Sequence, residues 1–256
     1  MHSSTLVSVI TPAYNCERTI RETIESVLAQ SYTNWELLIA DDCSTDHTAA
    51  IVTEYTQKDD RIRLICLEKN SGSAAARNIA IQSANGRYIA LLDSDDVWKP
   101  EKLERQLQFM NEHKYAFTFT AYDLFRNASD TKRRIFEVPK QIDYPQYLRN
   151  SIIGCLTVVV DREQIPDFHM ESGYLEDVLT WMHYLKKGIV AYGLNENLAS
   201  YRLSDGSKSA KKLRNAQRYY QCLRQQEIGF VFRIYCHLGY TYHACKKRLF
   251  SRRTPN

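Results

Sequence analysis

The first 122 residues alternate short apolar runs with segments of helical periodicity, and this alternation restricts the possible fold more than any other feature. Apolar or β-branched runs occupy residues 6–11, 35–40, 61–67, 87–92 and 115–122. Apolar residues recur at helical spacing over residues 18–30, 45–57, 73–84 and 100–113. Strands that alternate with helices of this length are typical of βαβ units. The sequence therefore predicts an α/β fold with a mainly parallel sheet and helices on both faces.

Beyond residue 122 the pattern weakens, and 126–144 is expected to be a loop. We interpret 1–210 as one catalytic domain followed by a helical tail, 211–256. The longest apolar run, 152–160, is too short for a membrane span, which needs about 20 residues. The first residues lack the charged and apolar regions of a signal peptide, and the seven scattered cysteines contain no Cys-x-x-Cys pair. A cytoplasmic protein with reduced thiols is expected.

The sharpest local signal is Asp93-Ser94-Asp95-Asp96, which directly follows an apolar strand. Ligands of parallel α/β sheets bind at the carboxyl ends of the strands. Two carboxylates spaced in this way can hold one divalent cation, Mn²⁺ or Mg²⁺, together with diphosphate oxygens and water. Asp93 and Asp95 are the candidate metal ligands, and Ser94 is a candidate diphosphate contact. An acidic cap for the next helix is the alternative.

Three further polar clusters also follow predicted strands. Asp41 and Asp42 can offer a carboxylate to a uracil or a ribose, although the same residues suit a turn and a cap. The segment from Pro12 through Tyr14 to Asn15 can stack an aromatic ring on a base, or can be an ordinary turn. The remaining candidates lie at the start of the helix predicted over residues 73–84. Gly72 precedes it and permits an unusual backbone angle, and Arg77 in its first turns can reach a phosphate or remain exposed on the helix.

Together these clusters resemble the family 2 inverting glycosyltransferases of the GT-A fold, over residues 7–122 and again over 173–209. The resemblance implies a Rossmann-like nucleotide-sugar-binding half, 1–122, with a mixed, mainly parallel sheet, and an acceptor-binding half, 123–210. It implies that Asp42 contacts uracil and that Asp95 is the principal metal ligand. The reaction it implies is hexose transfer from a UDP-sugar to an acceptor hydroxyl.

Two later segments carry further matches to the same family. The resemblance assigns the catalytic base to Asp177, with Glu176 beside it, although an acidic pair also suits the first turn of a helix. A carboxylate in that role takes the proton of the incoming hydroxyl as the new bond forms. Arg202 lies in a segment that resembles one that folds over the diphosphate in this family, and it is the candidate diphosphate contact. The histidine that the family often has in that segment is replaced here, near Ser204.

Two other functions remain open from the residues alone. Aspartate-based phosphotransferases also place Asp-x-Asp after a strand, but normally after the first strand rather than the fourth. A nucleotide-sugar-binding protein without transferase activity would retain the pocket and lack the base, and Asp177 argues against it.

The charge of the chain is unevenly distributed. From residue 211 onward, eleven Lys or Arg residues face one acid, Glu227, whereas the first 210 residues hold 23 basic and 29 acidic residues. Aromatic and basic residues mixed over 221–250 suit an anionic membrane surface, but helices packed on the catalytic domain are equally consistent. Nucleic acid is not expected as a partner, because the chain lacks a recognisable motif. Members of the resembled family often build bacterial surface polysaccharides on lipid-diphosphate carriers. A lipid-linked acceptor and peripheral association with the inner membrane face are therefore expected.

Overall fold

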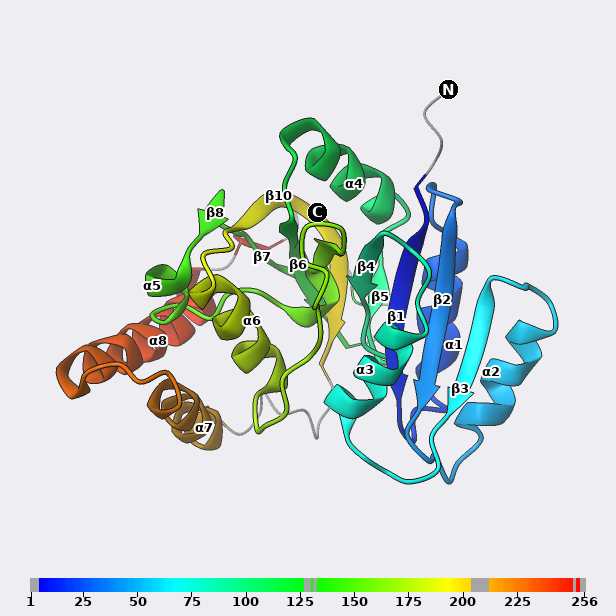
Figure 1. The fold of residues 1–256 in the computed structure, drawn as a ribbon, viewed down its shortest axis with the longest axis horizontal. Coiled ribbons are helices and arrows are strands. Elements are labelled where there is room, and N and C mark those ends of the chain that lie inside the picture. The colour runs from blue at the N-terminus through cyan, green and yellow to red at the C-terminus, as the bar shows by residue number, and fades with distance from the viewer. Residues whose placement is uncertain (1–4, 127–129, 131–132, 204–211, 251, 254–256) are drawn as a thin grey trace.

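The computed structural model describes residues 5–126, 130, 133–203, 212–250 and 252–253, and these form a mixed sheet flanked by helices (Figure 1). The strands are β1 (Val7–Ala13), β2 (Trp35–Asp41), β3 (Ile62–Cys66), β4 (Tyr88–Leu91), β5 (Val97–Trp98), β6 (Phe117–Phe125), β7 (Arg134–Phe136), β8 (Gln141–Ile142), β9 (Val159–Asp161), β10 (Ala191–Arg202) and β11 (Arg252–Arg253). The helices are α1 (Ile20–Leu28), α2 (Thr48–Thr56), α3 (Ser73–Gln82), α4 (Lys102–His113), α5 (Tyr144–Tyr147), α6 (Glu176–Lys186), α7 (Lys212–Arg224) and α8 (Phe230–Phe250), with a 3-10 turn at Cys155–Thr157. Each strand and helix predicted up to residue 122 is present, with ends shifted by a few residues.

The sheet order is β11-β7-β6-β9-β4-β1-β2-β3. Strands β4, β1, β2 and β3 run parallel, and Val9 of β1 is paired with Leu37 of β2 and Ala90 of β4. Strand β9 is antiparallel to β4 and β6, while β10 pairs parallel with β6 and antiparallel with β5 and β8. The predicted mixed α/β sheet is confirmed. Its parallel part brings the carboxyl ends of β1, β2 and β4 to one edge, where ligands of such sheets bind.

Both faces of β1, β2 and β4 are buried, which explains their nearly continuous apolar sequences, whereas the edge strand β3 is partly exposed. Alternate residues of neighbouring strands enter two apolar clusters. Ile10 and Leu38 pack with α3 and α6, whereas Val9 and Leu37 pack with α1 and α4. Figure 1 shows α3 and α6 on the near side of the sheet and α1 behind it. The helices therefore cover both faces, as the sequence pattern predicts.

Two segments differ from the sequence-based prediction. Strand β1 continues through Pro12 to Ala13, because its pairing with β4 ends at Ile10 and Pro12 needs no partner there. The prediction of a loop over 126–144 was wrong: β7 pairs with β6, β8 pairs with β10, and Tyr144 begins α5. These strands are two or three residues long and at the margin of the sheet, so they carry no periodicity that a sequence can reveal.

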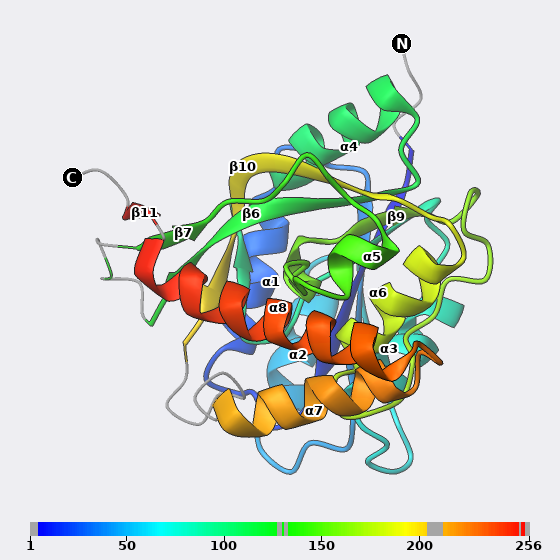
Figure 2. The same cartoon turned by 90° about the vertical axis from the view of Figure 1, so that its left-hand side faces the viewer.

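The predicted C-terminal helices are present and pack against the rest of the protein. Helices α7 and α8 lie side by side over α5 and α6 (Figure 2). Tyr219 of α7 is buried, donates its hydroxyl to the carbonyl oxygens of Tyr147 and Leu148, and stacks on Tyr240 of α8 at 3.8 Å between ring centroids. No helix in the described part of the chain is both long enough and apolar enough to cross a membrane.

Candidate active site

Two adjoining cavities open at the carboxyl edge of the parallel strands. The first has a volume of about 730 Å³, and the second, of about 310 Å³, continues from it toward α6. Both are lined by Ser73, Arg77, Asp93 and Tyr201. The first cavity is lined by every predicted nucleotide-sugar-binding residue except Asp41: Pro12, Tyr14, Asn15, Asp42, Gly72, Arg77, Asp93, Ser94, Asp95 and Arg202. The second contains both predicted catalytic residues, Glu176 and Asp177.

The Asp42 carboxylate organises one wall of the first cavity. It accepts hydrogen bonds from the backbone N–H groups of Ser71, at 2.7 Å, and Gly72, at 2.8 Å. Gly72 has φ +87°, a conformation that side-chain-bearing residues rarely adopt, and it immediately precedes α3. Asp42 therefore holds the loop before α3. Since a carboxylate has about four acceptor positions, it can also accept a hydrogen bond from a ligand.

The structure does not bring Asp41 to the cavity. Its side chain is buried and accepts hydrogen bonds from the Ser44 hydroxyl, at 2.5 Å, and the Ser44 backbone N–H, at 3.1 Å. These contacts close the turn after β2, and Asp41 is absent from the residues that line the two cavities. The alternative that the sequence left open for this residue, a turn, describes its position.

The loop after β1 is tied to the same turn. Asn15 has φ +47°, receives a hydrogen bond from the backbone N–H of Thr45, and donates its own N–H to the Ser44 hydroxyl. Tyr14 keeps 52% of its surface exposed at the rim of the cavity. An exposed ring in this position is available for stacking against a planar ligand.

The turn that follows β4 is held from two sides, by the α1 region and by β10. The Ser94 carbonyl oxygen accepts hydrogen bonds from Thr19 and Thr23 of the α1 region, at 2.9 and 3.0 Å. Asp96 is fully buried and accepts the backbone N–H of Arg202 at 2.8 Å. Asp95 is left facing the first cavity, and burial together with the neighbouring Asp93 raises the pKa of its carboxyl to about 6.

Arg202 lines the first cavity, but two of its three side-chain nitrogens already have partners. Its Nε donates to the Asp95 carbonyl oxygen at 2.7 Å, and its Nη2 pairs with Glu22 at 2.5 Å. Arg202 thus fixes the turn that presents Asp95. The support that Glu22 and Asp96 give to Arg202 could not be predicted, because neither residue lies near Arg202 in the sequence. The position near Ser204, where the resembled family often has a histidine, lies outside the described residues.

Arg77 joins the two cavities. It is almost fully buried, forms an ion pair and hydrogen bond with Asp93, and has its Nη1 3.5 Å from Glu176 Oε2. Glu176 also accepts a hydrogen bond from the Ser73 hydroxyl. The alternative of an exposed Arg77 was wrong, since the side chain points between the sheet edge and α6.

Asp177 lies beside this network without joining it. Within the described chain, its carboxylate has no hydrogen bond or ion pair to another side chain, and it lines the second cavity. Burial is the main cause that raises the pKa of Asp177, while Arg77 opposes this effect. A partly desolvated carboxylate with free acceptor positions is suited to taking a proton.

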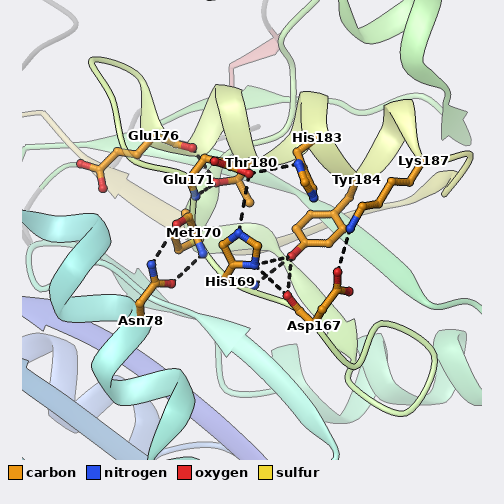
Figure 3. Close-up of polar contacts among 10 residues, drawn as sticks. All are labelled: Asn78, Asp167, His169, Met170, Glu171, Glu176, Thr180, His183, Tyr184 and Lys187. Atoms are coloured by element: carbon orange, nitrogen blue, oxygen red, sulfur yellow. Dashed lines mark hydrogen bonds and ion pairs between the residues drawn. The ribbon is translucent and has the colours of Figure 1, made fainter.

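A network of polar contacts holds the segment before α6 in place (Figure 3). Asn78 of α3 bonds both backbone groups of Met170, at 2.7 and 2.9 Å. Thr180 accepts the N–H of Glu171 and donates to the carbonyl oxygen of Glu176. These contacts anchor the start of α6, and hence its carboxylates, to α3. Sequence analysis did not single out Asn78 or Thr180, because short polar residues of this kind give no distinctive signal.

The residues of the first cavity fit a divalent cation that is coordinated mainly by the diphosphate of a bound nucleotide and by water. Among described residues, no three His, Cys, Asp or Glu side chains are placed to hold a metal ion together. Asp95 faces the cavity, whereas Asp93 is engaged by Arg77. Mg²⁺ and similar ions often use one or two carboxylates and complete their shell with phosphate oxygens and water. Asp95 provides such a carboxylate, and a diphosphate would supply the remaining negative charge.

The parallel half-sheet, the antiparallel extension and the acidic cavity at the strand ends define a glycosyltransferase of the GT-A fold. The family model for glycosyl transferase family 2 matches residues 8–160. The chain belongs to glycosyl transferase family 2.

Curated relatives of nearly equal length agree with this assignment. The chain is 46% identical over 246 residues to the "Putative teichuronic acid biosynthesis glycosyltransferase TuaG" of Bacillus subtilis, covering 95% of this chain and 98% of that protein. It is 40% identical over 246 residues to the UDP-Glc:alpha-D-GlcNAc-diphosphoundecaprenol beta-1,3-glucosyltransferase WfgD of Escherichia coli, covering 96% of each.

Solved structures support the fold. The S. aureus TarS 1-349 complex with UDP-GlcNAc superimposes with a TM-score of 0.71 at 21% identity, over 93% of this chain and 72% of that one. A longer TarS structure is covered over 43% of its length. The mannosyltransferase PcManGT of Pyrobaculum calidifontis, in complex with GDP-Man and Mn²⁺, gives a TM-score of 0.71 at 18% identity, over 97% and 74% of the two chains.

Proposed function

We propose that this protein transfers a hexose from a UDP-sugar, with inversion at the anomeric carbon, to a hydroxyl of a lipid-diphosphate-linked sugar in bacterial surface polysaccharide synthesis. The observation that carries the proposal is the Asp177 carboxylate, which has no side-chain partner among the described residues and lies in a cavity continuous with the one lined by Asp42 and Asp95. The similarity to WfgD, whose name specifies a UDP-glucose donor and a diphosphoundecaprenol acceptor, supports these substrate classes.

On the donor side, the nucleotide occupies the first cavity. Tyr14 is placed for stacking on the uracil, and Asp42 offers an acceptor to it while holding the loop at Gly72. The diphosphate would lie toward Asp95, the residue that would hold the divalent cation. When bound, that cation supplies positive charge to the leaving diphosphate. Arg77 adds a buried positive charge on the side toward the hexose.

On the acceptor side, Asp177 is the general base. Its carboxylate takes the proton of the acceptor hydroxyl, whose oxygen forms a bond to the anomeric carbon as the bond from that carbon to the diphosphate breaks. UDP leaves with the electron pair of the broken bond. Glu176 acts as a positioning residue, because its contacts with Ser73 and Arg77 fix the start of α6. A single displacement of this kind inverts the configuration.

The same proposal divides the chain into a nucleotide-sugar-binding half, 1–122, and an acceptor-binding half, 123–210, with 211–256 as the membrane-facing part. The outer face of α8 supports the last assignment. Exposed apolar side chains gather on α8: Phe230, Val231, Phe232, Ile234, Tyr235, Leu238 and Tyr242. Between residues 228 and 256 the sequence holds six Lys or Arg residues and no acid. An apolar helix face with this charge suits the surface of an anionic membrane.

The decisive experiment supplies UDP-sugars, Mn²⁺ or Mg²⁺ and a short-chain lipid analogue bearing N-acetylglucosamine diphosphate. We expect a disaccharide product whose anomeric configuration, read by proton NMR, is opposite to that of the donor. Retention of configuration would refute the displacement mechanism. UDP-sugar binding without hydrolysis or transfer to any tested acceptor would favour the alternative, a nucleotide-sugar-binding protein.

A further inference from the structure

Helix α7 reaches the mouth of the cavity that holds Asp177. Asn215 of α7 lines this cavity, together with Tyr174 from the loop before α6. Tyr174 is 69% exposed, and the guanidinium carbon of Arg218 lies 5.6 Å from the centroid of its ring. Arg218 is one turn from Asn215 on α7. The C-terminal region therefore contributes to the rim of the catalytic cavity as well as to the outer surface.

The charges inside the cavity need a compensating cation if the acceptor is anionic. Asp93, Glu176 and Asp177 all line it. The buried cation there, Arg77, is already paired with the first two of these carboxylates. A diphosphate brought next to this cluster would meet repulsion, which is strong where water is largely excluded.

Arg218 differs from Arg77 in having no ion pair within the described residues. Its contact there is the face of the Tyr174 ring, which leaves the N–H groups at the edge of the guanidinium available. A planar guanidinium that rests on an aromatic ring is well placed to bind phosphate oxygens with two parallel hydrogen bonds. The sequence of α7 contains four basic residues and no acid, which adds to the positive potential at this rim.

We propose that Arg218, held over Tyr174, binds the diphosphate of the acceptor, and that this contact places the acceptor sugar in the second cavity beside Asp177. The inference rests on the proposed function and extends it, since it gives α7 a role in acceptor recognition separate from membrane contact. Arg218 is a specificity-determining residue in this scheme, and Tyr174 positions it.

The test compares two probes of the same sugar, one an N-acetylglucosamine diphosphate with a short alkyl chain and the other an alkyl glycoside without the diphosphate. Binding is measured by calorimetry with UDP present, and transfer kinetics are measured in parallel. We expect R218Q to weaken binding of the diphosphate probe about tenfold or more, as for a lost hydrogen bond to a charged group. Its KM for that probe should rise while kcat and UDP affinity stay unchanged, and the neutral glycoside should be unaffected.

Arg224, exposed in the last turn of the same helix, provides the matched control. R224Q removes an equal charge and should leave both probes unaffected. The conservative variant R218K should recover part of the affinity, and Y174F should retain more of it than Y174A. If R218Q binds the diphosphate probe as wild type does, or weakens both probes equally, the role of Arg218 is refuted. If wild-type protein itself does not distinguish the two probes, the proposed acceptor class fails instead.

Discussion

Arg77 Nη1 lies 3.5 Å from Glu176 Oε2, so that a residue of α3 is paired with the residue that precedes the proposed base. Arg77 is also paired with Asp93, at the end of the central strand β4. One buried cation therefore connects the donor side of the site with the start of α6. This connection fixes the start of α6 relative to the end of β4, and the proposed transfer reaction needs a fixed geometry for donor and acceptor to align.

Replacing Arg77 by Met should strongly destabilise the protein and nearly abolish transfer. The change leaves two partly buried carboxylates without their partner, and breaking a buried pair costs about 3–5 kcal/mol. Urea unfolding followed by circular dichroism measures the effect. Arg21→Met, which breaks an exposed pair with Glu54, is the control and should have little effect. Equal stability of the two variants would contradict the bridging role of Arg77.

Replacing Asp177 by Asn should lower kcat by about 10²–10⁴-fold, the usual contribution of a general base. UDP affinity should stay unchanged, because Asp177 does not line the first cavity. Asp167→Asn is the control, since that residue forms an exposed pair with Lys187 in the segment before α6. Single-turnover kinetics and calorimetry separate the two effects. Full activity of the Asn variant would rule out this assignment of the base.

Transfer activity should decrease as the pH is lowered through the pKa of Asp177, because protonation removes the general base. Burial raises the pKa of this carboxyl in the folded protein above its unfolded value, and the base must be ionised to act. Stability should depend on pH in the opposite direction, because ionising the buried carboxyl disfavours folding. The contribution of Asp177 to the free energy of unfolding is most favourable below its pKa in the unfolded chain. This contribution is lost as the pH rises through its pKa in the folded protein. Asp177→Asn should therefore be as stable as wild type or more stable at neutral pH. A marked loss of stability would contradict this environment.

Removal of the divalent cation should abolish transfer. Excess chelator should do so reversibly, and Asp95→Ala should require more metal or remain inactive, because Asp95 faces the first cavity while Asp93 is engaged by Arg77. Asp60→Ala, at an exposed position on the surface, is the control. Transfer is assayed across a Mn²⁺ titration. Unchanged activity of Asp95→Ala at every metal concentration would exclude Asp95 as the ligand.

Charges placed on the outer face of α8 should release the protein from anionic vesicles. Val231 and Leu238 are 81% and 64% exposed, so V231E and L238E add charge without disturbing the core. The control Q221E adds the same charge to an exposed position of α7. Vesicle sedimentation at low and high salt measures binding. If none of the proteins binds, or if V231E and L238E bind as tightly as Q221E, the membrane contact of α8 is wrong.

The sequence by itself determined the helices and, except for the two-residue β5, the strands up to residue 122, together with the α/β class and most of the first cavity. These features follow from periodicity and from the rule that parallel strands place their carboxyl ends together, both of which depend on neighbouring residues. Asp42, Gly72 and Asp95 could therefore be placed at one edge of the sheet from the sequence alone. The short strands β7 and β8 could not be predicted in this way, because they form only through pairing at the margin of the sheet.

Only the tertiary structure decided which polar groups are free to act. It engages Glu176 with Ser73 and Arg77, while Asp177 in the next position has no side-chain partner in the described chain. It turns Asp41 toward Ser44, although Asp42 beside it lines the cavity. Each outcome depends on contacts between segments far apart in the sequence. Those contacts are set by how helices pack on the sheet, and the pattern of neighbouring residues carries no record of that packing.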